Sequence, residues 1–186
     1  PELRPASERS STLMAGSYLA IEEVVRHYEL DKILTKHFGE RAGLVLDLAS
    51  YMVVEGRNQG QYYPDYAYRH PLFTKDMRIV SDSTVSKFLS ELTRDQIAGV
   101  LNDWNKGRDH KSRIYVSYDS TNKNCQAGDV DFVEFGKAKV DLGLPIFNIG
   151  LAMDQSNRVP LFYELYPGSV NDVSQLRFVV DKAAAY

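Results

Sequence analysis

The N-terminal part of the chain, up to residue 106, carries apolar side chains every three or four residues, as amphipathic helices do. The pattern predicts helices at residues 17–30 and 31–38, and Gly39 ends the second one. A third helix is predicted at residues 41–55. Its apolar residues follow one another so closely that we expect it to be buried on most of its surface.

Hydroxyl side chains mark the starts of two further helical patterns. Ser81 or Ser83 is placed to cap a helix that runs to Leu92, and Thr93 is placed to cap one that runs to Trp104. Two short helices in succession could form a helix-turn-helix motif. The second one, however, exposes acidic and amide side chains, which suit a phosphate-lined groove poorly. An all-helical structural domain is the favoured interpretation.

Residues 58–70 are rich in tyrosine and lie near cationic side chains. The tyrosines are at positions 62, 63, 66 and 68, with Arg57, Arg69 and His70 close by. Aromatic and cationic groups together suit stacking on unpaired bases or binding to phosphates. The alternative, which we favour, is a connector whose rings pack on the helical domain.

After residue 106 the apolar pattern becomes that of strands. β-branched and aromatic residues alternate at 113–118 and predict a first strand. Two more strands are predicted at 146–153 and 159–166, with Asp154 in the hairpin turn between them. A last helix begins near Asp172, which with a glutamine three residues on resembles a capping box.

The chain is therefore predicted to be an α+β protein in three parts. Residues 1–16 form a disordered lead-in, and residues 17–106 form a helical N-terminal domain. Residues 107–186 form a domain of three antiparallel strands and a helix. The boundary is placed at the polar residues 105–109, which include Gly107.

Composition narrows the class of protein. The chain has 186 residues, of which 44% are hydrophobic and 11% aromatic, enough for a packed core. Its net charge of -3 counts against a protein whose main purpose is to bind bulk DNA. A local excess of lysine and arginine over aspartate nevertheless occurs between residues 104 and 123.

Several other classes are disfavoured by what the sequence lacks. The single Cys125 rules out an internal disulfide and a cysteine-based zinc site, and fits a reducing cytoplasmic setting. No apolar run approaches the ~20 residues of a membrane span. There is no phosphate-binding glycine-rich loop and no Gly-x-Ser-x-Gly turn, which argues against a nucleotide hydrolase and against an esterase, and no nucleotide cofactor is expected. The four histidines form no recognisable metal motif.

Three stretches of the second half occur in an ordered series. They are Asp-Ser-Thr at 119–121, Gly-Lys-Ala-Lys at 136–139, and Pro-Leu-Phe-Tyr-Glu-Leu-Tyr-Pro-Gly at 160–168, followed by Asn171 and Asp172. In this order and spacing they resemble the opening half of the catalytic domain of DDE transposases of the insertion-sequence-four type. The resemblance implies the first half of a ribonuclease-H-like domain.

The resemblance also implies roles for single residues. Asp119 is expected at the C-terminal end of the first strand, as the first acid that binds a catalytic Mg²⁺ or Mn²⁺ ion. Its structural alternative is an aspartate that caps the turn after a strand. Lys123, Lys137 and Lys139 flank this expected site and either contact DNA phosphates or are solvated. Asp181, on the last helix, is a less favoured extra acid.

The family's second aspartate and its glutamate lie beyond the last helix, and the chain ends at Tyr186 within that helix. We therefore expect an N-terminal fragment of a bacterial, nucleoid-associated transposase. By itself it is expected to be catalytically inert and to bind no metal, and the intact protein to act on transposon ends as a homodimer. The alternatives are a non-catalytic DNA-binding or dimerising module, a remnant or regulator of transposition, and, less favoured, a nuclease on the same fold.

Overall fold

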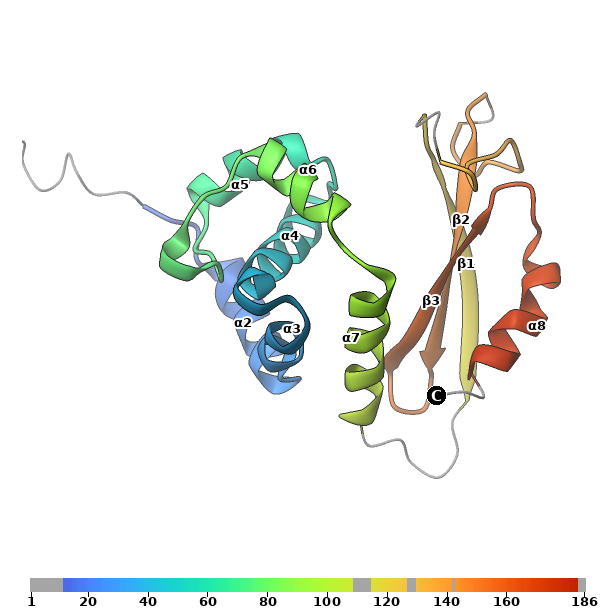
Figure 1. The fold of residues 1–186 in the computed structure, drawn as a ribbon, viewed down its shortest axis with the longest axis horizontal. Helices are drawn as coiled ribbons and strands as arrows, with labels where there is room; N and C mark the ends of the chain where they lie inside the picture. The colour runs from blue at the N-terminus through green and yellow to red at the C-terminus, as the bar shows by residue number, and fades with distance from the viewer. Residues whose placement is uncertain (1–11, 109–114, 127–129, 142, 184–186) are drawn as a thin grey trace, which may run out of the picture. The chain divides into compact units, whose positions relative to one another are not determined.

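The computed structural model describes residues 12–108, 115–126, 130–141 and 143–183 (Figure 1). It is an α+β structure that combines helices with a three-stranded antiparallel sheet. The chain folds into two compact units, Pro1–Trp104 and Asn105–Tyr186. We call them the N-terminal unit and the C-terminal unit, and the division between them lies two residues before the predicted domain boundary.

The N-terminal unit is built of helices joined by short turns. They are α2 (Gly16–His27), α3 (Leu30–Phe38), α4 (Ala42–Glu55), α5 (Tyr63–Arg69), α6 (Asp82–Ser90) and α7 (Arg94–Lys106), with 3-10 turns η1 (Gly39–Arg41), η2 (Gly60–Tyr62) and η3 (Lys75–Met77). The last two residues of α7 belong to the C-terminal unit. The predicted helices are thus confirmed, with ends shifted by a few residues.

The chain is structured before the predicted end of the lead-in. Residues 1–11 lie outside the described residues, but the amide of Met14 donates to the carbonyl of Arg69 at 2.8 Å. α2 then begins at Gly16. A lead-in disordered up to residue 16 is therefore too long by several residues.

The predicted caps are confirmed by their hydrogen bonds. Gly39 ends α3 with a φ of 58°, a conformation that favours glycine. The Ser81 hydroxyl accepts from the amide of Thr84 at 3.3 Å. Thr93 and Gln96 form a reciprocal capping box, in which each side chain accepts from the other's backbone amide, at 3.2 and 3.0 Å.

The tyrosine-rich segment is divided between core and surface. Tyr63 and Tyr66 are fully buried and pack edge-on or tilted against Tyr51 of α4. Burial raises the pKa of Tyr66 to about 12, so its phenol is neutral at physiological pH. Tyr62 and Tyr68 are 41% and 74% exposed. The packing interpretation is confirmed for the first pair only.

Helix α4 is buried along one face but not at its C-terminal end. Leu44, Leu46 and Tyr51 are buried, whereas Val53 is 75% exposed. The expectation that α4 is buried on most of its surface is therefore wrong for its last turn, because no other described element packs over Val53 closely enough to bury it.

Asp47 is a buried carboxylate that holds a loop against α4. Its oxygens accept from the amides of Phe73 and Thr74, at 2.7 and 3.0 Å, and from the Thr74 hydroxyl at 2.6 Å. Gly43, one turn earlier, allows the loop to come close, since a Cβ there would lie 2.6 Å from the Phe73 carbonyl. Burial raises the pKa of Asp47, and these three hydrogen bonds oppose the rise.

We expect Asp47→Asn to lower the free energy of unfolding by about 1–3 kcal/mol, because the new NH₂ group replaces an acceptor of buried donors. Urea unfolding followed by circular dichroism measures the loss. Asp31→Asn, at an exposed acid of α3, is the matched control, with an expected change of a few tenths of a kcal/mol. Equal losses in the two variants would contradict the role of Asp47.

The C-terminal unit is a sheet followed by a helix. The strands are β1 (Val116–Asn124), β2 (Ile146–Asp154) and β3 (Val159–Pro167), antiparallel and in the order β1-β2-β3, and the helix is α8 (Asp172–Ala183). The second and third strands and the helix are as predicted. The register of β2 on β3 is irregular at Ala152/Met153.

The first strand is not where the sequence pattern placed it. Residues 113 and 114 lie outside the described residues, and β1 continues past Tyr118 to Asn124. Its polar residues stay in the sheet because β2 offers a partner to each of them, from Ser120 opposite Gly150 to Asn124 opposite Ile146. Asp119 therefore lies in the middle of the strand, not at its end.

The two faces of the sheet differ. Tyr118, Ala152 and Phe162 lie on one face and pack with Val179 of α8, which runs alongside the sheet in Figure 1. The ammonium group of Lys182 adds an ion pair to Glu164 at 2.6 Å. Asp119 belongs to the other set of alternating residues, so its side chain lies on the opposite face.

The hairpin turn after β2 and the start of α8 are each held by a polar side chain. Asp154 is fully buried and accepts from the amides of Ser156 and Asn157, which confirms it as the residue of the hairpin turn. α8 is capped by Asn171, whose side-chain oxygen accepts from the amide of Ser174 at 2.9 Å. The side chain of Asp172, the predicted cap, lies outside the described residues.

Candidate functional site

A pocket of about 480 Å³ in the C-terminal unit is the candidate functional site. We call it the motif pocket, because all three stretches that carry the family resemblance contribute to it. Its lining residues are Ser120, Thr121, Asn122, Phe135, Gly136, Lys137, Lys139, Asn148, Gly168, Ser169, Val170 and Asn171.

Two motif glycines bring one wall of this pocket together. A Cβ on Gly136 would lie 2.0 Å from the Gly168 carbonyl oxygen, and a Cβ on Gly168 would lie 2.3 Å from that of Ile146. Both obstacles are backbone atoms, which no rotamer change can move. Glu134 and Ile146 exchange both backbone hydrogen bonds, at 2.8 and 2.9 Å, and hold the wall in place. Only glycine fits at this crossing.

Asparagine side chains of β1 hold the lysine-bearing segment. The Asn122 amide donates to the Lys137 carbonyl and accepts from the Lys139 backbone amide, both at 2.9 Å. Asn124 makes the same pair of bonds with the carbonyl and amide of Asp141, at 2.9 and 3.3 Å. These amides take the place of a neighbouring strand's backbone, so the lysine segment keeps a defined position beside β1.

The floor of the pocket contains a buried amide. Asn148, near the start of β2, donates from its side chain to the carbonyls of Pro167 and Val170, at 2.8 and 3.0 Å. It thereby holds the link between β3 and α8. Asn171, at the start of α8, completes this side of the pocket.

The predicted site residues are not all brought together. Lys137 and Lys139 line the motif pocket, and the ammonium group of Lys139 donates to the Ser120 carbonyl at 2.7 Å. Asp119 and Lys123 are exposed on the opposite face of β1. Strand alternation thus does not bring Asp119 and Lys123 together with Lys137 and Lys139, and a site of Asp119 flanked by all three lysines stays a prediction.

Asp119 lies beside an incompletely covered apolar surface. In the register it stands opposite Leu151, which in turn faces Tyr163 of β3. Leu151 and Leu165 on this face are 43% and 46% exposed. One oxygen of Asp119 accepts from the amide of Ser120 at 2.9 Å.

Asp119 is the one carboxylate of the predicted metal site that the described residues include. Among them, no group of three or more His, Cys, Asp or Glu side chains is placed to hold one. Asp154 is occupied by its turn, and Asp181 lies on α8, which covers the other face. Mg²⁺ is bound through one or two carboxylates together with water and phosphate. Asp119 fits as one such ligand but does not make a site without further acids.

Comparison of the chain with protein-family models, with curated proteins and with solved structures gives no match. In the described part of the chain, no helix combines the length and the apolar character needed to cross a bilayer.

Sequence reasoning missed Asn148 and Phe135 among the residues of the motif pocket. Asn148 interrupts the apolar run of β2, and a polar residue within a buried strand is a signal that could have indicated it. Phe135 is 70% exposed at the pocket. Nothing in the sequence distinguishes it from a core phenylalanine.

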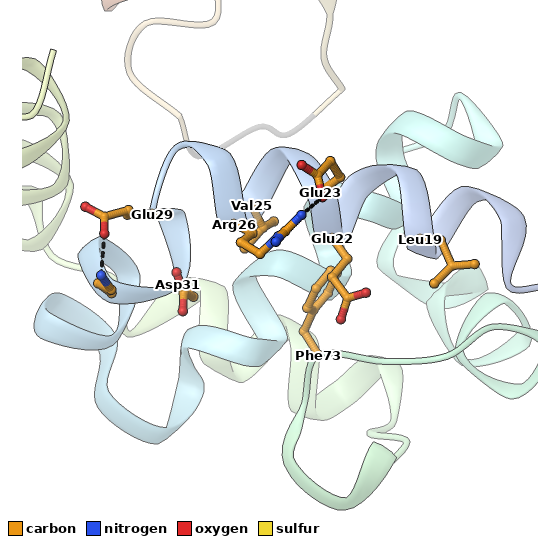
Figure 2. Close-up of a pocket in the computed structure, with 9 residues that line it drawn as sticks. Leu19, Glu22, Glu23, Val25, Arg26, Glu29, Asp31 and Phe73 are labelled. Carbon is orange, nitrogen blue, oxygen red and sulfur yellow. Dashed lines mark hydrogen bonds and ion pairs between the residues drawn. The ribbon is translucent and has the colours of Figure 1, made fainter. Parts of the chain in front are cut away.

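A second hollow lies in the N-terminal unit and is shown in Figure 2. Four acidic residues line it, Glu22, Glu23, Glu29 and Asp31, whereas its cations pair with two of them, Arg26 with Glu23 and Lys32 with Glu29. The excess of negative charge makes this hollow unsuited to nucleic acid.

His37, also in the N-terminal unit, pairs with an aspartate of α7. Its Nε2 lies 2.6 Å from a carboxylate oxygen of Asp103, which also pairs with Lys36 at 2.7 Å. Hydrogen bonds from Lys36 and His37 lower the pKa of Asp103. The contact joins α3 to α7, and so assigns this histidine a packing role.

Proposed function

We propose that this chain belongs to a DNA transposase of the insertion-sequence-four DDE type, and that Asp119 is the first of its three metal-binding acids. The observation that carries the proposal is the convergence of the three motif stretches. Residues 120–122, 136–139 and 168–171 are far apart in the sequence but line one pocket. Motif residues that meet in space are better evidence for a shared site than their order in the sequence alone.

The topology of the C-terminal unit also supports the proposal. A ribonuclease-H-like domain would begin with three antiparallel strands and a helix on one face, which is the arrangement of β1, β2, β3 and α8. Asp119 lies on the first strand and on the face that α8 leaves open. In such domains divalent cations held by carboxylates polarise a phosphate oxygen and activate water or a 3′-hydroxyl. Asp119 would hold one of them, and the remaining acids would come from elsewhere in the intact protein.

The reading frame that encodes the chain tests this proposal directly. We expect it to continue into a strand that ends in aspartate and, later, into a helix that carries glutamate. A frame that lacks both would refute the enzyme. Activity is tested by the Asp119 variant described in the Discussion.

A second candidate function, a dimerising module, is favoured by the edge of the sheet. β1 is nine residues long, and among the described residues it pairs with β2 alone. Residues 137–141 lie beside its second half, held by Asn122 and Asn124, so the first half of its other edge is the part that can serve as a template for pairing with another chain. A second copy of the chain would pair with this edge in a homodimer.

We expect the protein to sediment as a dimer whose dissociation depends on concentration. Amide exchange along residues 116–119 should be slow at high protein concentration and faster after dilution, because the outer edge becomes solvated when copies separate. Exchange along β2, which is paired on both sides, is the internal control. A monomer at all concentrations, with fast exchange along β1, would contradict the dimer.

A further inference from the structure

We propose that the motif pocket binds one unpaired nucleotide of single-stranded DNA, with the base on the ring of Phe135 and a phosphate between Lys137 and Lys139. This site is distinct from Asp119, which lies on the other face of β1. The inference rests on the proposed function in one respect only, the choice of DNA over RNA. The nucleotide itself follows from the chemistry of the pocket.

The charge of the pocket favours a phosphate. Among the described residues that line it, Lys137 and Lys139 are the only charged ones and none is a carboxylate. The carboxylate of Glu134 accepts from the hydroxyl of Ser169, one of the lining residues. Two ammonium groups two residues apart on one segment suit the backbone of a single strand.

The other polar side chains give the pocket its shape. Asn122 and Asn148 are engaged with backbone groups, as described above, and the Asn171 oxygen accepts from both the amide and the hydroxyl of Ser174. Asn171 caps α8, a helix of 12 residues, so the positive end of the helix dipole lies at the pocket and adds to the attraction for an anion.

The exposed ring and the size of the pocket decide between paired and unpaired DNA. Phe135 is 70% exposed, so one face of its ring is available for stacking. Bases inside a duplex are already stacked on their neighbours, whereas an unpaired base has a free face. A volume of about 480 Å³ lies within the range of pockets that enclose a small ligand. One nucleotide fits this description and a double helix does not.

The test uses the full chain and fluorescence anisotropy of a labelled short oligothymidine. We expect Phe135→Ala to weaken binding roughly 5- to 100-fold, the usual range for loss of one stacked base, and Phe135→Trp to retain it. Lys137→Gln and Lys139→Gln should each reduce the slope of log affinity against log salt by about 0.7. The same sequence in duplex form should bind much more weakly.

Matched controls come from the exposed surface of α8. Phe178→Ala and Arg177→Gln remove a ring and a cation outside the pocket and should leave strand binding unchanged. Because Phe135 is exposed and outside the core clusters, we expect its variants to keep the wild-type melting temperature. A loss of binding without a loss of stability supports the pocket.

Three results would each overturn the inference. They are equal binding of duplex and single strand, equal behaviour of Phe135→Ala and Phe178→Ala, and tighter binding of oligouridine than of oligothymidine. Strand binding is measured without metal and without cleavage. A negative result here therefore does not contradict the role proposed for Asp119, and a negative result for Asp119 does not contradict nucleotide binding in the motif pocket.

Discussion

Asp119→Asn is expected to abolish DNA strand cleavage by the intact protein while transposon-end binding stays within a few-fold of wild type. Asparagine has the size of aspartate and keeps an oxygen that accepts from the Ser120 amide. It lacks the negative charge that a divalent cation requires of its ligands. Cleavage of a labelled transposon end in Mg²⁺, with binding followed in parallel by gel shift, measures the two effects separately.

Asp181→Asn is the matched control for this experiment. Asp181 is an exposed acid of α8, and α8 packs on the face of the sheet opposite Asp119. We expect its variant to cleave at the wild-type rate. Wild-type cleavage by Asp119→Asn would refute the assignment of the first metal-binding acid. If Asp181→Asn lost as much cleavage activity as Asp119→Asn, the α8 face of the sheet would also take part in cleavage.

Gly136→Ala is expected to destabilise the C-terminal unit by about 3 kcal/mol, at the upper end of the cost of inserting a methyl group into a packed structure. The added Cβ would lie 2.0 Å from the Gly168 carbonyl oxygen and 3.2 Å from the Ile146 side chain. The first of these is backbone, so relief requires the wall of the motif pocket to separate from β2. Urea unfolding and amide exchange along Ile146–Asp154 measure the loss.

Gly143→Ala provides the control, because it makes the same substitution in the same connecting stretch. A Cβ at Gly143 would lie 3.4 Å from a carboxylate oxygen of Asp141, an ordinary contact. We expect a change within about 0.5 kcal/mol. If Gly136→Ala were as well tolerated as Gly143→Ala, the close crossing of residues 136 and 168 would be contradicted.

Local signals predicted the helices and their ends. Ser81 and Thr93 were identified as caps because the groups that they bond lie three residues away in the sequence. The alternating and apolar runs at β2 and β3 were recognised for the same reason, since each strand buries one set of its own side chains. Asn171 was passed over although asparagine is a favoured cap, and its hydrogen bonds to the amide and hydroxyl of Ser174 now show this role.

The position of Asp119 within β1 could not be predicted from nearby residues alone. Residues 120–124 are polar and resemble a loop, so the first strand was ended before them. They form strand because backbone hydrogen bonds with β2 do not depend on side-chain polarity, and because Asn122 and Asn124 find partners at residues 137–141. Once the strand continues, the two-residue alternation separates Asp119 and Lys123 from Lys137 and Lys139.

The sequence by itself determined the helical character of the N-terminal unit, the three strands and final helix of the C-terminal unit, and the motifs around Asp119, Gly136 and Gly168. Each depends on residues within a few positions of one another, whose spacing sets burial and capping. Only the tertiary structure decided that two glycines 32 residues apart cross backbone to backbone, and that Phe135 is exposed beside two lysines. Contacts between distant segments depend on how the whole sheet pairs, and no short window of sequence contains that information.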